Sequence, residues 1–146
     1  MKFWHIGILT PDVEKTLDAL CAMSGGRRGV WQIGEIEFPS SEMITGSGGR
    51  LKTAVGRMGG IVYELIQPLD EHSFHAAALK RRGPGLHHAA YVCGEELDAD
   101  VASCIAAGAQ IVWEARHGEE HVCYLEAKDG GSVLELINIC PPMPEE

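Results

Sequence analysis

Two histidines and two glutamates lie within apolar, strand-like stretches of the sequence, at positions His5, Glu64, His88 and Glu135. Strand side chains alternate between faces, so each glutamate shares a face with the apolar residues two positions before and after it. A carboxylate in an apolar layer is costly unless it is paired, protonated or bound to a cation. Two neutral imidazoles and two carboxylates around a divalent cation would form a site of zero net charge. Mixed nitrogen and oxygen ligands suit Zn, Co, Ni, Mn or Fe better than Ca or Mg. We therefore predict one divalent transition metal at these residues.

An internal repeat places these four residues at equivalent positions in two halves of the chain. Residues 50–66 align without a gap with residues 121–137, which pairs Glu64 with Glu135. Residues 4–9 align with residues 87–92, which pairs His5 with His88 rather than with His87. A pseudo-twofold axis between the halves would bring the four side chains together. Core histidines or ordinary buried His–Glu ion pairs are the alternative interpretation.

Each half of the sequence predicts a strand, a helix and three further strands. In the first half, strands are expected at residues 1–9, 30–38, 51–56 and 61–67, with a helix from Val13 to the glycines at 25–26 and a loop over residues 39–49. The second half repeats this order, with strands at 86–92, 111–115, 122–127 and 132–139 and a helix over 96–107. We expect a single domain of residues 1–146, divided into module 1 (about 1–67), a linker (68–85) with a short helix over 73–80, module 2 (about 86–140) and a mobile tail (141–146).

Composition excludes several classes of function. Of the 146 residues, 12 are Lys or Arg and 21 are Asp or Glu, a net charge of −9, which argues against nucleic-acid binding. No stretch approaches the roughly 20 apolar residues of a membrane span. The five cysteines include no C-x-x-C pair, which is typical of a reduced cytoplasmic protein. We expect a cytoplasmic protein with a small-molecule substrate and, because twofold dimers are the commonest assembly, a homodimer.

The chain resembles the vicinal oxygen chelate superfamily, which includes glyoxalase I, methylmalonyl-CoA epimerase, extradiol dioxygenases and antibiotic-resistance proteins. Four segments carry the resemblance: WHIGILTPDVEKTLDAL at 4–20, YELIQPL at 63–69, KRRGPGLHHAAYV at 80–92 and AKDGGSVLELI at 127–137. The last two are most similar to methylmalonyl-CoA epimerase. The resemblance implies an α+β fold in which two βαβββ modules pair mixed and antiparallel sheets that curl around a metal-binding cavity. It implies the same four metal ligands.

Such a site would act on a substrate with two neighbouring oxygens, such as an acyl-CoA or a thiol adduct. The metal would polarise the carbonyl while Glu135, or as second choice Glu64, removes the adjacent proton. This chemistry serves an epimerase, an isomerase or a glyoxalase-like lyase. The resembling epimerases carry a second glutamate where this chain reads TGSGG at 45–49, and Glu42 lies several residues too early. Many also have an amide where Glu64 stands, whereas glyoxalase I has two carboxylates.

An extradiol-type iron dioxygenase and a metal-free binding or resistance protein are the alternative functions. A fourth ligand at Glu64 argues against the first, which uses two histidines and one carboxylate. Two uncompensated buried carboxylates argue against the second. The remaining polar residues are expected to face solvent. One group is the cluster His117, Glu119, Glu120 and His121 at a turn, of which His121 alone has a chance of reaching the cavity. The linker residues His72 and His75 are expected to face solvent or a partner module. The basic run Lys80-Arg81-Arg82 is expected on the surface, and the alternative is contact with CoA phosphates. Trp4, Trp31 and Trp113 are expected in the core or an interface.

Overall fold

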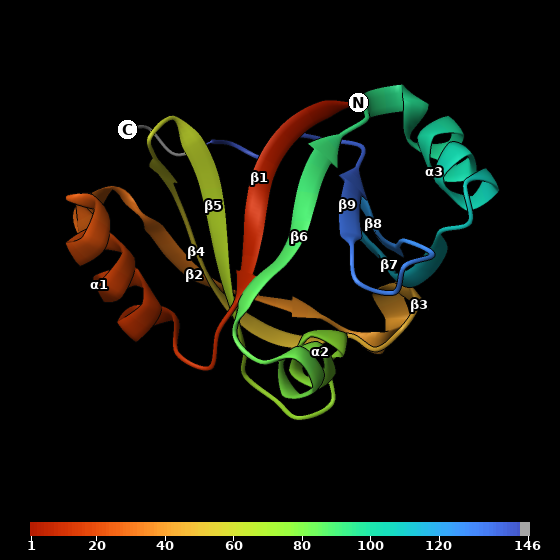
Figure 1. The fold of residues 1–146 in the computed structure, drawn as a ribbon. Helices are drawn as coiled ribbons and strands as arrows, with labels where there is room; N and C mark the ends of the chain where they lie inside the picture. The colour runs from red at the N-terminus through yellow and green to blue at the C-terminus, as the bar shows by residue number, and fades with distance from the viewer. Residues whose placement is uncertain (144–146) are drawn as a thin grey trace.

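The protein is built around a single curved sheet of nine strands (Figure 1). The computed structural model describes residues 1–143 of the chain. The strands run in the order β2-β4-β5-β1-β6-β9-β8-β7-β3, and the sheet curls into a half-barrel. The fold is therefore α+β with mixed strand pairing, as the sequence predicts.

The repeat is visible in the order of the elements. Module 1 consists of β1 (Lys2–Leu9), α1 (Val13–Ser24), a 3-10 turn η1 (Arg28–Val30), β2 (Gln32–Phe38), η2 (Ser40–Glu42), β3 (Met43–Thr45), β4 (Gly49–Met58) and β5 (Ile61–Pro68). The linker contains α2 (Phe74–Arg82). Module 2 consists of β6 (Gly85–Val92), η3 (Gly94–Glu96), α3 (Leu97–Ala106), β7 (Gln110–His117), β8 (Glu120–Glu126) and β9 (Val133–Ile137).

The first strands of the two modules join the halves of the sheet. β1 pairs with β6 in antiparallel orientation, and each also pairs in parallel with the last strand of its own module, β5 or β9. The remaining strands extend outwards through antiparallel pairs, β5 to β4 to β2 and β9 to β8 to β7. The four strands predicted to carry the metal ligands are thus the four central strands of the sheet.

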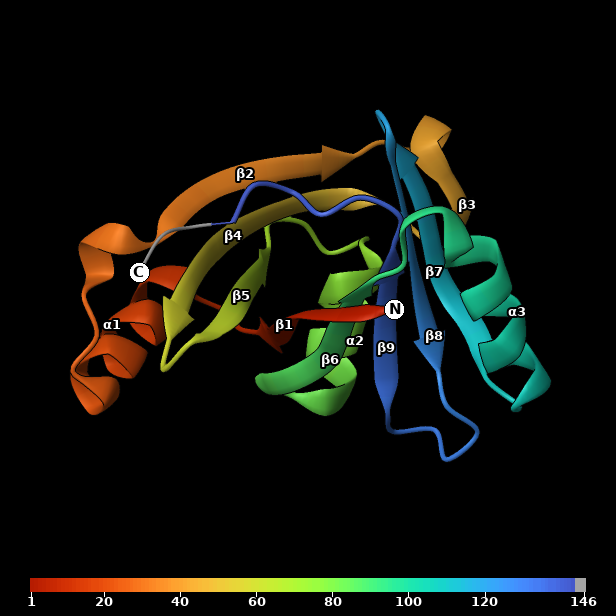
Figure 2. The same cartoon turned by 90° about the horizontal axis from the view of Figure 1, so that it is seen from above.

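Two helices cover the outer face of the sheet at its opposite ends (Figures 1 and 2). Val13 and Leu17 of α1 are fully buried and belong to a cluster with Trp31, Ala54 and Leu65. In module 2, Leu97 of α3 packs in an equivalent cluster with residues of β8 and β9. Because the helices cover the outer face, the concave inner face is left free to form a cavity.

The segment expected to be a loop contains an additional strand. β3 pairs with β7 of the other module, with Met43 opposite Ala115 and Thr45 opposite Glu114. β2 and β3 are close in sequence, yet they lie at opposite ends of the strand order. The connection between them therefore links the two edges of the half-barrel.

The end of the described chain returns to module 1. After β9, the backbone runs back over the concave side of the sheet (Figure 2), where Trp4 Nε1 donates to Met143 Sδ at 2.9 Å. Residues 144–146, the last part of the expected mobile tail, lie outside the described residues. Within residues 1–143, no helix is long and apolar enough to cross a membrane.

Candidate metal centre

Strand register brings the four predicted ligands together at the centre of the sheet. His5 lies on β1, Glu64 on β5, His88 on β6 and Glu135 on β9. One nitrogen or oxygen atom from each side chain can be chosen so that all four lie within 4.8 Å of one another. His5, His88 and Glu135 are buried, and the Glu64 side chain is 23% exposed.

The separations of these atoms match those of ligands around one ion. His5 Nε2 lies 3.0 Å from Glu64 Oε2, 3.5 Å from Glu135 Oε2 and 3.1 Å from His88 Nε2. His88 Nε2 lies 2.8 Å from Glu135 Oε2. Neighbouring ligands at right angles, each about 2.1 Å from a transition metal, would be about 3.0 Å apart. The four residues therefore fit a divalent transition metal in chemistry and in spacing.

The electrostatics of the site show how strongly it favours positive charge. Burial alone would lower the pKa of His5, but Glu64 and Glu135 raise it to about 10. Burial would raise the pKa of Glu135, but hydrogen bonds and charge interactions with His5 and His88 hold it well below its ordinary value. Without a cation, a proton on His5 thus partly neutralises the two carboxylates. A divalent ion would do so more completely.

A second histidine, His87, forms a hydrogen bond with His88, one of the predicted ligands. The Nδ1 atoms of His87 and His88 lie 2.9 Å apart, so one ring donates a hydrogen bond to the other. Burial lowers the pKa of His87 to about 3, which keeps its ring neutral. Donation from His88 Nδ1 leaves its Nε2 lone pair facing the site, as a metal ligand requires. His88 Nε2 thus lies in the converging group, and His87 lies outside it and contacts the other ring nitrogen of His88.

The ring of His88 needs a glycine on the neighbouring strand. Gly7 of β1 is paired with His88 of β6, and a Cβ atom at Gly7 would come closer than 3.0 Å to three atoms of the imidazole ring. On the other side of the pseudo-twofold axis, His5 is paired with Ala90. Each histidine thus lies beside a small residue of the facing strand, which lets the two rings approach each other.

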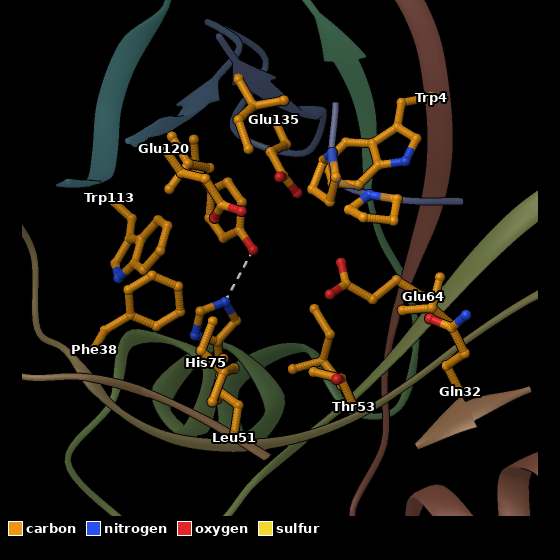
Figure 3. Close-up of a pocket in the computed structure, with 18 of the residues that line it drawn as sticks. Trp4, Gln32, Phe38, Leu51, Thr53, Glu64, His75, Trp113, Glu120 and Glu135 are labelled. Carbon is orange, nitrogen blue, oxygen red and sulfur yellow. Dashed lines mark hydrogen bonds between the residues drawn. The ribbon is translucent and has the colours of Figure 1, made fainter. Parts of the chain in front are cut away.

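The side chains of Glu64 and Glu135 point into an apolar cavity of about 340 Å³ (Figure 3). Its lining is mostly apolar and aromatic, and it includes Trp4, Phe38, Trp113 and Tyr124. Among the described residues that line it there is no lysine or arginine. The end of the chain, residues 141–143, also contributes to the wall.

His75, expected to face solvent, is instead a buried residue of the cavity wall. It is 2% exposed, and its Nε2 lies 3.0 Å from the hydroxyl of Tyr124. Burial lowers the pKa of His75 to about 3 and raises that of Tyr124 well above its ordinary value, so both stay neutral. The expectation failed because α2 carries few large apolar side chains that would mark its buried face in the sequence.

The polar cluster at the β7–β8 turn also differs from the expectation. Glu120 lines the cavity, whereas His121 points to the other face of β8 and pairs with Glu114 at 2.7 Å. The alternation of Val122 and Tyr124, extended back by two residues, would have predicted the position of Glu120. Glu42 does not line this cavity. Its carboxylate pairs with His117 Nδ1 at 2.9 Å.

Two βαβββ modules form a half-barrel with a His/Glu cluster at its centre, and Glu64 and Glu135 of this cluster line the cavity. The sequence of residues 4–125 matches the family model of the Glyoxalase/Bleomycin resistance protein/Dioxygenase superfamily. The chain therefore belongs to this superfamily, the vicinal oxygen chelate superfamily named above as a resemblance. No curated protein sequence matches the chain.

Several solved structures share the fold along almost the whole chain. A hypothetical protein from Bacillus halodurans C-125 is 21% identical with a TM-score of 0.68, and the match covers 99% of this chain and 98% of that one. Methylmalonyl-CoA epimerase from Mycobacterium tuberculosis is 23% identical with a TM-score of 0.64, covering 96% and 89%. A Streptomyces coelicolor methylmalonyl-CoA epimerase variant in complex with 2-nitronate-propionyl-CoA is 23% identical with a TM-score of 0.61, covering 94% and 93%. At these identities the likeness shows the fold alone.

Proposed function

We propose that the protein is a metal-dependent enzyme that removes a proton from a carbon next to a carbonyl group. The observation that carries this proposal is the convergence of two histidines and two glutamates within 4.8 Å, two of them lining an apolar cavity. A bound divalent ion would polarise the carbonyl and stabilise the negative charge that develops on its oxygen.

In this proposal, His5, His88 and Glu64 hold the ion, and Glu135 also acts as the base. The Glu135 side chain is 7% exposed and lies in an apolar wall, whereas that of Glu64 is 23% exposed. A carboxylate in such surroundings gains basicity when its contact with positive charge loosens. Glu135 is therefore our first choice for the base and Glu64 our second.

The substrate class follows from the ligand count and the cavity wall. Four protein ligands leave two positions of a six-coordinate ion, which suit two neighbouring oxygens of one molecule. The apolar wall suits the carbon skeleton next to them. The solved relatives include epimerases with methylmalonyl-CoA and with 2-nitronate-propionyl-CoA. We infer epimerisation of an acyl-CoA as the preferred reaction, and isomerisation of a thiol adduct, as in glyoxalase I, as the second.

Glu64, as a fourth ligand, also argues against the two alternative functions, an iron dioxygenase and a metal-free binding protein. A dioxygenase of the two-histidine, one-carboxylate class keeps three positions for substrate and oxygen, and Glu64 would fill one of them. A metal-free binding protein would leave two carboxylates close together and compensated only by a proton on His5. Both alternatives fit this set of residues less well than proton abstraction does.

The test is a metal analysis followed by solvent-deuterium incorporation. We expect the purified protein to bind one Zn²⁺, Co²⁺, Ni²⁺, Mn²⁺ or Fe²⁺ per chain. In heavy water, it should then place deuterium at the α-carbon of methylmalonyl-CoA or of the methylglyoxal–glutathione adduct. Glu135→Gln should abolish the exchange, and Glu37→Gln, at an exposed residue of β2, should leave it unchanged. Bound metal without exchange into either probe would reject the proposed chemistry.

A further inference from the structure

A third carboxylate, that of Glu120, enters the same cavity from the second module. β8 begins at Glu120, and its inward-facing residues are Glu120, Val122 and Tyr124, all of which line the cavity. The intervening Cys123 belongs to the outer cluster beneath α3. Strand alternation therefore fixes Glu120 on the inner face, and Figure 3 shows its side chain pointing into the space that Glu135 and Glu64 also face.

The carboxylate of Glu120 is not engaged in a structural contact. Within residues 1–143, it forms no hydrogen bond or ion pair, although two carboxylates of the same region do so. Glu42 pairs with His117, and Glu114 pairs with His121. Burial raises the pKa of Glu120; His117 opposes the shift, and the charges of Glu135 and Glu64 add to it. Glu120 is thus a free acid–base group inside an apolar cavity.

Strand register separates Glu120 from the metal ligands. Tyr124 of β8 is paired with Glu135 of β9, and Glu120 lies four residues further along β8. At about 3.4 Å per residue, this places the two backbone positions about 14 Å apart along the strand. Glu120 is also absent from the group of side chains whose ligand atoms converge. The gap leaves room for a substrate between the carboxylates of Glu135 and Glu120.

Epimerisation needs two proton-transfer groups, because the proton must leave one face of the α-carbon and return to the other. We propose that Glu120 is the second catalytic acid–base residue, acting on the face of the substrate opposite Glu135. In one direction, Glu135 takes the α-proton and the C–H bond electrons move onto the carbonyl oxygen. The protonated Glu120 then delivers its proton to the opposite face of the carbon. Exchange with water returns both carboxyl groups to their starting states. This inference rests on the proposed function.

The experiment compares three proteins loaded with Co²⁺, using separated 2R and 2S epimers of methylmalonyl-CoA in heavy water. Wild type should exchange the α-proton of both epimers and interconvert them. Glu120→Gln should still exchange the epimer whose proton faces Glu135, should lose exchange of the other, and should interconvert the two at least about 100-fold more slowly. Glu119→Gln is the matched control, because Glu119 is the adjacent residue and is exposed.

A second measurement separates a catalytic role from a structural one. Glu120→Gln should keep the wild-type Co²⁺ affinity and absorption spectrum, because Glu120 is not a ligand, whereas Glu135→Gln should change both. Wild-type rates of interconversion in Glu120→Gln would overturn the assignment while leaving the proposed function intact. Equal loss of exchange for both epimers, or a changed Co²⁺ spectrum in Glu120→Gln, would also overturn it. If wild type exchanges neither epimer, epimerisation and this role of Glu120 are both wrong, but exchange into the glutathione adduct would still support proton abstraction.

Discussion

Replacing Gly7 with alanine should damage the metal centre without removing a ligand. The added Cβ would come closer than 3.0 Å to three ring atoms of His88, so the ring must shift away from the other three ligands. Overpacking of this kind costs about 1–3 kcal/mol of folding stability. Disturbing the orientation of a metal ligand typically lowers metal affinity by about 10- to 100-fold. We expect Gly7→Ala to show both effects.

Thermal unfolding with and without metal measures the loss. A ligand at 100 times its Kd stabilises a fold by about 2.7 kcal/mol, but a variant that binds 100-fold more weakly gains only about 0.4 kcal/mol at the same concentration. For a chain of this size, about 1 kcal/mol changes the Tm by about 2–4 °C. Zn²⁺ should therefore raise the Tm of wild type by about 5–10 °C and that of Gly7→Ala by about 1–2 °C.

Gly34→Ala is the matched control for this prediction. Gly34 lies on the exposed strand β2, and a Cβ added there would meet no atom within 4 Å. Its metal-induced change in Tm should equal that of wild type. If Gly7→Ala and Gly34→Ala respond equally to Zn²⁺, the idea that Gly7 positions the ring of His88 is wrong. If wild type itself does not respond, the four residues do not form a metal site.

Two further predictions concern the proton on His5 and the core of module 1. Because the pKa of His5 is raised from 6.5 to about 10, its proton stabilises the metal-free fold fully below pH 6.5, and this stabilisation is lost as the pH rises through 10. Metal binding at pH 7 should accordingly release about one proton from this residue, measured by calorimetry in buffers of different ionisation enthalpy; zero release would contradict the raised pKa. Leu17→Ala, at a fully buried position of α1, should lower the free energy of unfolding in denaturant titrations by about 2–5 kcal/mol. The Zn²⁺-induced rise in Tm should stay unchanged, and its loss would show that the helix layer and the metal centre are coupled.

The sequence predicts the four converging residues because they leave a strong local signal. A charged or titratable residue inside an apolar strand is unusual, and the same type at the same place in both halves indicates a shared site. The alternation of side chains along each strand then predicts which face of the sheet each of the four residues lies on. The register between β1 and β6 confirms that the two halves meet edge to edge. Repeat and alternation together are sufficient here, without any knowledge of contacts between distant residues.

β3 and the wall residues His75 and Glu120 depend on information that local patterns do not contain. β3 has only three residues and pairs with a strand of the other module, so its existence rests on a long-range contact. The orientation of α2 decides the burial of His75, and that orientation is set by packing against the sheet. For Glu120, the error lies in the expected start of the strand, which the structure places two residues earlier, at Glu120 itself.

The pairing of β1 with β6 explains why neither module could form the centre alone. Each half supplies one histidine and one glutamate, and the repeat aligns Gly7 with Ala90, the two small residues that face the opposite histidines. The 3.1 Å approach of the two Nε2 atoms therefore requires both halves, each providing a ring and the space for the partner's ring. Because the ligands come from both sides of the β1–β6 junction, a bound ion would bridge the modules at the same place where their strands pair. A bound ion would therefore add stability to a junction that the β1–β6 pairing already forms, and its removal should loosen this junction before it loosens the helices at either end.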